Sequence, residues 1–378
     1  MYTAMADIAG LTQDEDLLNA CRRLWDNIVT RQMYITGGIG STRHGEAFTF
    51  DYDLPNDTVY QETCASIGLI FFASRMLQIE KKSVYADVIE QALYNSVLSG
   101  MSLDGESFFY VNPMESWPME SEKNPDRSHI KAERQSWYGC ACCPPNIARL
   151  LTSLGQYAFS TSSDTIYVHQ YIGGEARLGL ADCELVLVTE TNYPWDGRIR
   201  IELRGIKEET FTLALRRPGW SRQASLHING QETSLASRLR DGYIYIDRSW
   251  KDGDQLELVF DMTPELVQAN PMVRYNAGKL AIRRGPLVYC LEQVDNGENL
   301  SLISIDPDAS LQAVFDKNLL GGAMIVKGMG YRVNTDSWDR DLYRPVQVDE
   351  KPCTIKAIPY FMWGNREKGQ MLVWIRQR

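Results

Sequence analysis

Three cysteines fall within four residues of the segment WYGCACCPPNIARLL, at positions 140, 142 and 143. Thiolates bind soft metal ions and are strong nucleophiles, so such a cluster can hold a metal or attack an electrophilic carbon. The two prolines that follow favour an extended Cys143 and a helix that starts at about Pro145. Cys142 and Cys143 are therefore expected at a helix N-terminus, where backbone N–H groups stabilise a thiolate. The alternative is that they are small hydrophobic residues of the core.

A second segment, VYQETCASIG, supplies the carboxylate of Glu62 and the thiol of Cys64. Together with Cys142 and Cys143 they offer three sulfur ligands and one oxygen ligand, a full tetrahedral set for zinc. Because residues i and i+2 do not face the same way on a helix, we expect the helix to begin at or after Cys64, with Glu62 in the preceding turn. A first-turn carboxylate is the alternative for Glu62. A closed four-ligand site would also suit a purely structural zinc.

The third candidate is Glu46, in the glycine-rich segment GGIGSTRHGEAFTFDYDLP. The glycines do not match a phosphate-binding fingerprint, because no Gly-Lys-Ser/Thr follows them. They indicate a loop that brings a carboxylate to a cleft. A solvated loop glutamate is the alternative, and Asp51 and Asp53 are rival carboxylates that suit turns. Aromatic residues that could line a sugar-binding cleft cluster in the next loop, at Phe108, Phe109, Tyr110, Trp117, Trp137 and Tyr138.

The elements that must position these residues fall into two regimes. Apolar residues at helical spacing predict helices over about 14–29, 65–79 and 83–99, with a fourth after Pro145. Long irregular loops, 34–57 and 101–143, lie between them, and loops of that length are usually functional. From about Asp164 short alternating segments with turn signals predict antiparallel β-sandwiches. The predicted strands are 165–172, 184–189, 198–205, 210–217, 225–228, 243–247 and 255–260.

The composition restricts the class of partner. The 378-residue chain has a formal net charge of -10, which argues against nucleic acid or an anionic membrane as its main partner and is compatible with a neutral sugar. No stretch approaches the apolar length of a membrane span, and the first residues lack the pattern of a secretory signal. The eight cysteines do not form the framework of a small disulfide-stapled scaffold, so we expect reduced thiols and a cytoplasmic location.

Six motifs together resemble glycoside hydrolase family 127, the family of the zinc-containing β-L-arabinofuranosidases. They are YITGGIGS, GEAF, ETCA, FYVNP, YGCACCPPNIAR and RRGPLVYCLE. The resemblance implies an (α/α)6 barrel followed by two antiparallel β-sandwich domains. Family members carry a long helical region before the point where this chain begins, so only the C-terminal part of the barrel is expected. The corresponding domains would be 1–158, 159–263 and 264–378.

The resemblance also implies roles for individual residues. Cys142 would be a zinc-bound nucleophile, and Glu46 the acid/base. The remaining ligands of Zn2+ would be Glu62, Cys64 and Cys143, and Tyr110 would lie near the substrate. The implied reaction is retaining hydrolysis that releases L-arabinofuranose from the non-reducing ends of β-L-arabinofuranosides.

The expected substrate is an arabinose-containing oligosaccharide, and the C-terminal sandwich suggests a homodimer. Two alternatives stay open at this stage. One is a carbohydrate enzyme that uses two carboxylates, such as Glu46 and Glu62. The other is a carbohydrate-binding protein, or an inactive fragment, in which the zinc is structural.

Overall fold

The computed structural model describes residues 1–181, 183–338 and 340–378. These residues form two compact units, each assembled from separate stretches of the sequence. The first unit combines Met1–Asp26, Ile67–Leu93 and Pro145–Met262, and the second combines Asn27–Ser66, Tyr94–Pro144 and Thr263–Arg378. Both of the predicted long loops therefore belong to the second unit, together with the C-terminal strands.

The helices confirm the amphipathic pattern in the sequence. Their bounds are α1 Tyr2–Thr12, α2 Glu15–Asn27, α3 Thr63–Ile79, α4 Ser83–Ala92, α5 Pro118–Lys123, α6 Cys143–Thr152, α7 Gly155–Ala158 and α8 Gln293–Asn296. The π-helical turns Ile28–Gln32 and Leu93–Val97 prolong α2 and α4, which accounts for the predicted ends near 29 and 99. The sequence pattern did not predict α1, α5, α7 or α8.

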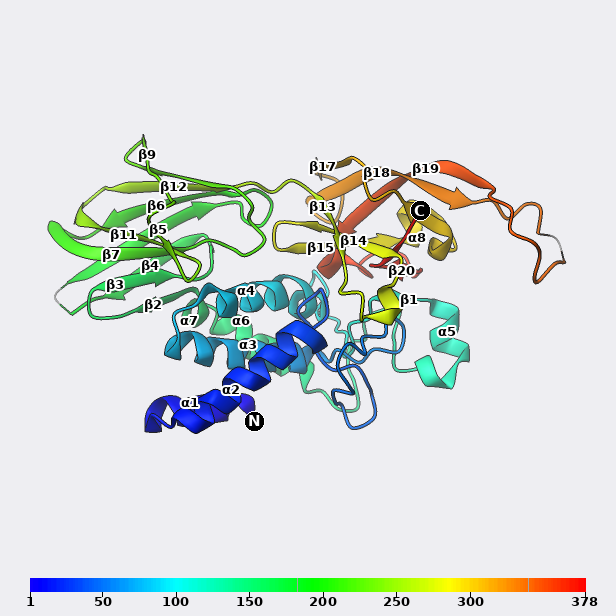
Figure 1. Cartoon of the computed structure of the whole chain (residues 1–378), viewed down its shortest axis with the longest axis horizontal. Coiled ribbons are helices and arrows are strands. Elements are labelled where there is room, and N and C mark those ends of the chain that lie inside the picture. Colours follow the sequence, from blue (N-terminus) through cyan, green and yellow to red (C-terminus); the bar gives the residue numbers. More distant parts are fainter. Residues whose placement is uncertain (182, 339) are drawn as a thin grey trace. The chain divides into compact units, whose positions relative to one another are not determined.

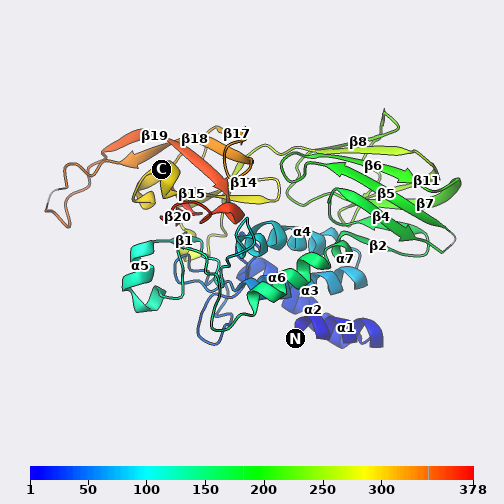
Figure 2. The same cartoon turned by 180° about the vertical axis from the view of Figure 1, so that it is seen from behind.

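Helices of the first unit pack through aromatic side chains. Trp25 of α2 contacts Phe72 of α3 and Tyr85 of α4, with ring centroids 5.8 Å and 4.7 Å apart. All three side chains are buried, and burying a large apolar side chain contributes about 1.5–3 kcal/mol. On another side of α3, the Arg149 guanidinium of α6 lies 4.6 Å from the ring centroid of Phe71, and Figure 2 shows these two helices alongside each other. This contact ties α6 to α3 within the first unit.

The most apolar long helix, α3, is a core helix with Ile67, Ile70 and Ala73 buried. Its seventeen residues are fewer than the roughly 20 of a typical membrane span. Among the residues that the structure describes, no helix combines the length and apolar composition of a membrane span.

The remainder of the first unit consists of two sheets, which Figure 1 shows as stacked layers. Their strand orders are β10-β11-β7-β3-β2 and β4-β5-β6-β12-β8-β9. The strands are β2 Phe159–Thr161, β3 Thr165–Val168, β4 Gly174–Gly179, β5 Glu184–Thr191, β6 Arg198–Arg204, β7 Glu208–Arg216, β8 Ala224–Ile228, β9 Gln231–Glu232, β10 Leu239–Arg240, β11 Tyr243–Lys251 and β12 Gln255–Phe260. Alternate residues are buried, as Ile199, Ile201 and Leu203 are in β6. All seven predicted strands are confirmed.

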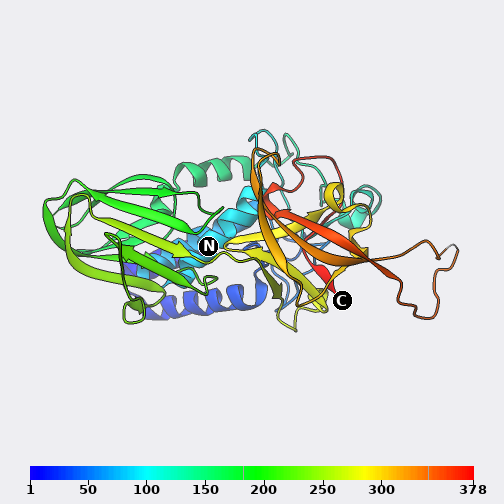
Figure 3. The same cartoon turned by 90° about the horizontal axis from the view of Figure 1, so that it is seen from above.

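The second unit contains one ten-stranded sheet, in which β18 and β19 form the long orange hairpin of Figure 3. Its strands are β1 Glu115–Ser116, β13 Glu265–Gln268, β14 Lys279–Arg284, β15 Leu287–Glu292, β16 Ile303–Ile305, β17 Leu311–Asp316, β18 Ala323–Val333, β19 Glu350–Pro359, β20 Met371–Leu372 and β21 Ile375–Gln377. The first residues of β14 pair with β21 and its last residues pair with β15. The hydrogen-bonded strands therefore form a closed circuit, from β15 through β19, β18, β16 and β21 to β14 and back to β15. The sequence had predicted a β-sandwich here.

Candidate metal centre and active site

The four predicted metal ligands lie together in the second unit. The ligand atoms of Glu62, Cys64, Cys142 and Cys143 are all within 4.8 Å of one another. Cys143 Sγ is 3.7 Å from Cys64 Sγ and 3.8 Å from Cys142 Sγ. Glu62 Oε1 is 3.2 Å from Cys142 Sγ and 4.0 Å from Cys143 Sγ. Sulfur ligands about 2.3 Å from a tetrahedral zinc are about 3.8 Å apart, and the separations of Cys143 Sγ from the other two sulfurs match this value.

Two helix starts bring these ligands together. Glu62 directly precedes α3 and pairs with Val111 in an isolated β-bridge, while Cys64 is the second residue of α3. Cys142 precedes α6 and Cys143 is its first residue. The positive ends of both helices are therefore close to the cluster, where they favour anionic ligands. The prediction that Glu62 lies before its helix is confirmed.

Both helices begin earlier than predicted. The second starts at Cys143, although the sequence had suggested an extended Cys143 and a start near Pro145. Prolines are accepted here because the first turn of a helix needs no N–H donors. The first starts at Thr63, where the sequence had suggested Cys64 or later. There the Thr63 hydroxyl donates to the carbonyl of Phe109 over 2.9 Å.

The cluster is electrostatically unfavourable when its thiols are deprotonated in the absence of a cation. Burial, together with the nearby Glu62 and Cys64 and against a hydrogen bond from Tyr110, raises the pKa of Cys142 to about 12. The pKa of Cys143 is raised still more, by its hydrogen bond to Cys64 and by burial. Since each acidic group opposes ionisation of the next, a bound cation is what would stabilise all of them as anions. The sulfur-rich set suits a soft ion such as zinc.

Glu46 lies beside this cluster and accepts hydrogen bonds from two tyrosines, one of which also contacts Cys142. Its backbone has the left-handed φ of 50°, in an exposed loop. Tyr60 Oη donates to Glu46 Oε1 over 2.8 Å, and Tyr110 Oη donates to the same oxygen over 3.3 Å. Cys142 Sγ is 3.5 Å from Tyr110 Oη. Burial raises the pKa of both tyrosines above the ordinary value, so both phenols keep their protons at neutral pH.

The backbone that carries Tyr110 is held from two sides. Tyr138 Oη accepts a hydrogen bond from the Tyr110 N–H over 3.1 Å and donates one to the Phe108 carbonyl over 2.9 Å. Phe109 turns the other way and stacks on Trp363, with ring centroids 4.5 Å apart. The Arg134 guanidinium lies over the Phe109 ring, 4.4 Å from its centroid, and Arg134 is buried. These contacts place the Tyr110 phenol at the cluster.

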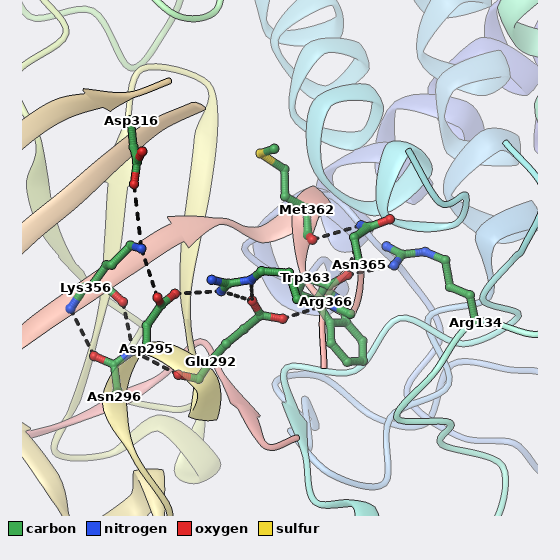
Figure 4. A network of polar contacts seen from close by, with 11 residues as sticks. Arg134, Glu292, Asp295, Asn296, Asp316, Lys356, Met362, Trp363, Asn365 and Arg366 are labelled. Atoms are coloured by element: carbon green, nitrogen blue, oxygen red, sulfur yellow. Dashed lines mark hydrogen bonds and ion pairs between the residues drawn. The ribbon is translucent and has the colours of Figure 1, made fainter. Parts of the chain in front are cut away.

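A charged network supports Trp363 from behind, as Figure 4 shows. The Arg134 guanidinium donates to the Trp363 carbonyl over 2.7 Å. The buried carboxylate of Glu292 accepts from the Gly364 N–H over 2.8 Å and from Arg366 Nε over 3.1 Å. Arg366 also reaches Asp295 over 2.6 Å. The network ties the turn that follows β19 to the strand β15, so the sheet of this unit supports the segment with Tyr110.

The other candidates take different places. Asp51 accepts hydrogen bonds from Asn27 and Gln32, and Asp53 accepts one from Thr49, so both rival carboxylates serve the loop. Cys140 is exposed and is not part of the four-ligand cluster.

Tyr60 was not predicted as a site residue. The signal available was its position two residues before Glu62, which became informative only when the structure placed its hydroxyl on Glu46.

Three family models match successive parts of the chain. The GH127 catalytic domain of β-L-arabinofuranosidase matches residues 2–156, the GH127 middle domain matches 165–262, and the C-terminal domain of glycoside hydrolase family 127 matches 264–376.

Individual relatives agree with these matches. A non-reducing end β-L-arabinofuranosidase of Bifidobacterium longum subsp. longum is 41% identical over all of this chain, which spans 58% of that relative. The crystal structure of a GH127 β-L-arabinofuranosidase from Geobacillus stearothermophilus T6 is 48% identical, with a TM-score of 0.97 over the whole chain and 59% of its own length. A GH127 β-arabinofuranosidase structure is 36% identical, with a TM-score of 0.91 over the whole chain and 59% of its own. The chain belongs to glycoside hydrolase family 127.

Proposed function

We propose that the protein takes part in retaining hydrolysis of β-L-arabinofuranosides, releasing L-arabinofuranose from non-reducing ends of an arabinose-containing oligosaccharide. The observation that carries the proposal is the short path from Cys142 through Tyr110 to Glu46, with 3.5 Å and 3.3 Å between the hydrogen-bonded atoms. A nucleophile and a carboxylic acid this close can act on the same glycosidic bond, one attacking its carbon and the other protonating its oxygen. Family membership supports the choice of sugar.

Glu62, Cys64, Cys142 and Cys143 would hold Zn2+, whose positive charge would keep the thiols deprotonated at neutral pH. The site fits the ion in its donor set and in its dimensions.

The side chains have distinct roles in the proposed reaction. The Cys142 thiolate attacks the anomeric carbon, and a C–S bond forms as the bond to the leaving oxygen breaks. Glu46 gives its proton to that oxygen, which departs with the bonding electron pair. A water molecule then loses a proton to Glu46 and attacks the same carbon, releasing the cysteine. Two inversions retain the anomeric configuration.

The domain organisation is part of the same proposal. Residues 1–158 would form the C-terminal part of an (α/α)6 barrel, with a middle domain over 159–263 and a C-terminal domain over 264–378. The three family models divide the chain at similar places, which supports these limits.

The test is hydrolysis of an aryl β-L-arabinofuranoside by the purified, zinc-loaded chain. We expect Cys142→Ser to remove turnover. Cys140→Ser is the matched control, since Cys140 is exposed and outside the cluster, and it should keep full activity. Substantial turnover by Cys142→Ser would rule out the cysteine as nucleophile. In methanol-containing buffer, the methyl glycoside formed should keep the anomeric configuration of the substrate.

The closed four-ligand cluster favours one alternative, a carbohydrate-binding protein with a structural zinc. This alternative predicts that the zinc-loaded chain binds arabinofuranosides without cleaving them and that chelation unfolds it. An enzyme that uses Glu46 and Glu62 as its two carboxylates would instead keep its activity after zinc is removed.

A further inference from the structure

We propose that Tyr60 is the positioning residue for the acid/base carboxylate, and that it commits Oε2 of Glu46 to carrying the proton. The inference rests on the proposed function of Glu46 and assigns a task to a residue outside the predicted site. The reason is that one carboxylate oxygen of Glu46 accepts hydrogen bonds from two tyrosines while the other accepts none from the described residues.

Both tyrosine hydroxyls converge on one carboxylate oxygen. Tyr60 and Tyr110 donate to Oε1 of Glu46 over 2.8 Å and 3.3 Å. Among the described residues, no hydrogen bond or ion pair reaches Oε2. A carboxylate oxygen that already accepts two hydrogen bonds is the less available one for a proton. Oε2 is therefore the oxygen left to exchange a proton with the leaving group and then with water.

The two donors are not equivalent. The hydroxyl of Tyr110 has a single proton and lies between two acceptors once Cys142 is a thiolate, because Sγ is 3.5 Å from it on the other side. Whenever that proton turns to the thiolate, Glu46 loses one of its donors. Tyr60 Oη donates to Glu46, and toward Tyr60 the hydroxyl of Tyr110 is a donor rather than a second acceptor. Tyr60 is thus the constant donor, and Tyr110 is the shared one.

The ring of Tyr60 is itself held in place. It lies between two aromatic neighbours, with its centroid 5.8 Å from that of Tyr110 and 6.3 Å from that of His129. His129 is fixed in turn by a hydrogen bond between Nε2 and the Val59 carbonyl, over 3.2 Å. Glu46, in contrast, sits in an exposed loop. An exposed glutamate has many rotamers, so a rigid donor is needed to hold its carboxylate in one orientation.

In the proposed step, the Cys142 thiolate forms its bond to the anomeric carbon as Glu46 gives up its proton. The proton on Oε2 moves to the leaving oxygen while the bond from that oxygen to the anomeric carbon breaks, and the bonding electrons stay with the oxygen. Glu46 becomes a carboxylate that keeps its hydrogen bond from Tyr60. Losing this orienting bond should therefore slow cleavage of the glycosidic bond only where the leaving oxygen needs a proton.

The experiment compares zinc-loaded wild type and Tyr60→Phe on two substrates. One is a β-L-arabinofuranosyl disaccharide, whose leaving alcohol needs a proton, and the other is the 2,4-dinitrophenyl glycoside, whose leaving group does not. We expect kcat of Tyr60→Phe on the disaccharide to fall by about 10- to 100-fold with KM nearly unchanged, the loss typical of one hydrogen bond to a charged group. Bond cleavage in the dinitrophenyl glycoside should slow by less than about 3-fold, measured as the burst of dinitrophenol, because later attack by water also uses Glu46.

Tyr331→Phe in β18 is the matched control, since its ring faces Arg378 and takes no part in the site. It should leave both rates and the zinc content at wild-type values. Equal losses by Tyr60→Phe on the two substrates would overturn the proposal, because they would mean that Tyr60 shapes the whole pocket. Unchanged rates on both substrates would overturn it as well.

A second measurement does not depend on turnover. In a crystal structure of zinc-loaded Tyr60→Phe, we expect the Glu46 side chain to leave its wild-type rotamer or to spread over several. A carboxylate that keeps its place on Tyr110 would overturn the proposal. If the wild-type chain cleaves neither substrate, the proposed function fails for this chain, while the two crystal structures still decide the role of Tyr60.

Discussion

Glu292→Gln tests whether the charged network behind Trp363 supports the site. Glu292 is buried, with its side chain 6% exposed. Its Oε1 accepts from the Gly364 N–H, and its Oε2 accepts from two nitrogens of Arg366. Glutamine keeps only one acceptor oxygen, so its NH2 group must face either the Gly364 N–H or the Arg366 guanidinium. At least one buried donor then loses its partner, at a cost of about 1–3 kcal/mol.

Loss of the negative charge adds to this cost. Removing the only partner of a buried ion costs about 3–5 kcal/mol, but Arg366 keeps Asp295 as a second partner 2.6 Å away. We therefore expect the free energy of unfolding to fall by about 2–4 kcal/mol in Glu292→Gln. The turn that holds Trp363 should also loosen, and kcat should fall with the stability, because Trp363 stacks on the neighbour of Tyr110.

The assay is urea unfolding at 25 °C, with the zinc content of each sample measured beforehand. Glu122→Gln is the control, because the pair of Glu122 with Lys368 involves the same turn but is exposed on both sides. Its loss should stay below about 1 kcal/mol. If Glu292→Gln lost no more stability than Glu122→Gln, the reasoning about the buried acceptor would be refuted.

Two further predictions concern the metal and the acid stability. Cys143→Ser should lower bound zinc from one equivalent to a small fraction by elemental analysis, because Cys143 is the fully buried ligand with short contacts to the other three, whereas Cys140→Ser should bind a full equivalent. Burial, Lys81 and Arg216 lower the pKa of His169 to about 3, so only the unfolded chain takes up this proton as the pH falls below about 6.5. Stability should therefore decrease by about 1.4 kcal/mol per pH unit between about pH 6.5 and 3 on account of this residue. Urea unfolding at pH 7, 6 and 5 gives the free energy of unfolding as a function of pH. In His169→Gln this free energy should fall less steeply toward low pH, by the contribution of up to one proton. An unchanged dependence on pH would contradict the assignment.

Local patterns predicted part of the fold. Helical spacing identified α2, α3 and α4, and alternation identified seven strands of the first unit, because each of these elements buries one face against its own unit. Helix α1 was not predicted because its residues are apolar without a clear face, and only Ala6 and Ala9 are buried. The closed circuit of the second sheet could not be predicted from periodicity. It depends on β14 sharing its length between two partners, which is a matter of register.

The candidate ligands are recognisable from their residue types and not from periodicity. Two cysteines before two prolines, and an acid with a cysteine, are rare enough combinations that their chemistry indicates a metal site before their positions are known. The sequence does not show how the side chains around these ligands are oriented. The hydrogen bonds of Tyr60 and Tyr138 have no signature in sequence, because a phenol near a charged residue is more often part of an ordinary core.

The loop with Glu46 explains why the tyrosine contacts needed the structure. Gln61 closes this loop, as its N–H donates to the Gly40 carbonyl over 2.8 Å and its Oε1 accepts from Thr36 over 2.9 Å. A Cβ on Gly38 would lie 1.9 Å from Gln61 Oε1, so a larger residue there would displace the Gln61 side chain. The loop path therefore depends on a buried glutamine one residue away from both Tyr60 and Glu62. The glycines indicate a loop in the sequence, but it is their contact with Gln61 that sets Glu46 opposite Tyr60, and a donor and acceptor fourteen residues apart can be matched only once that path is known.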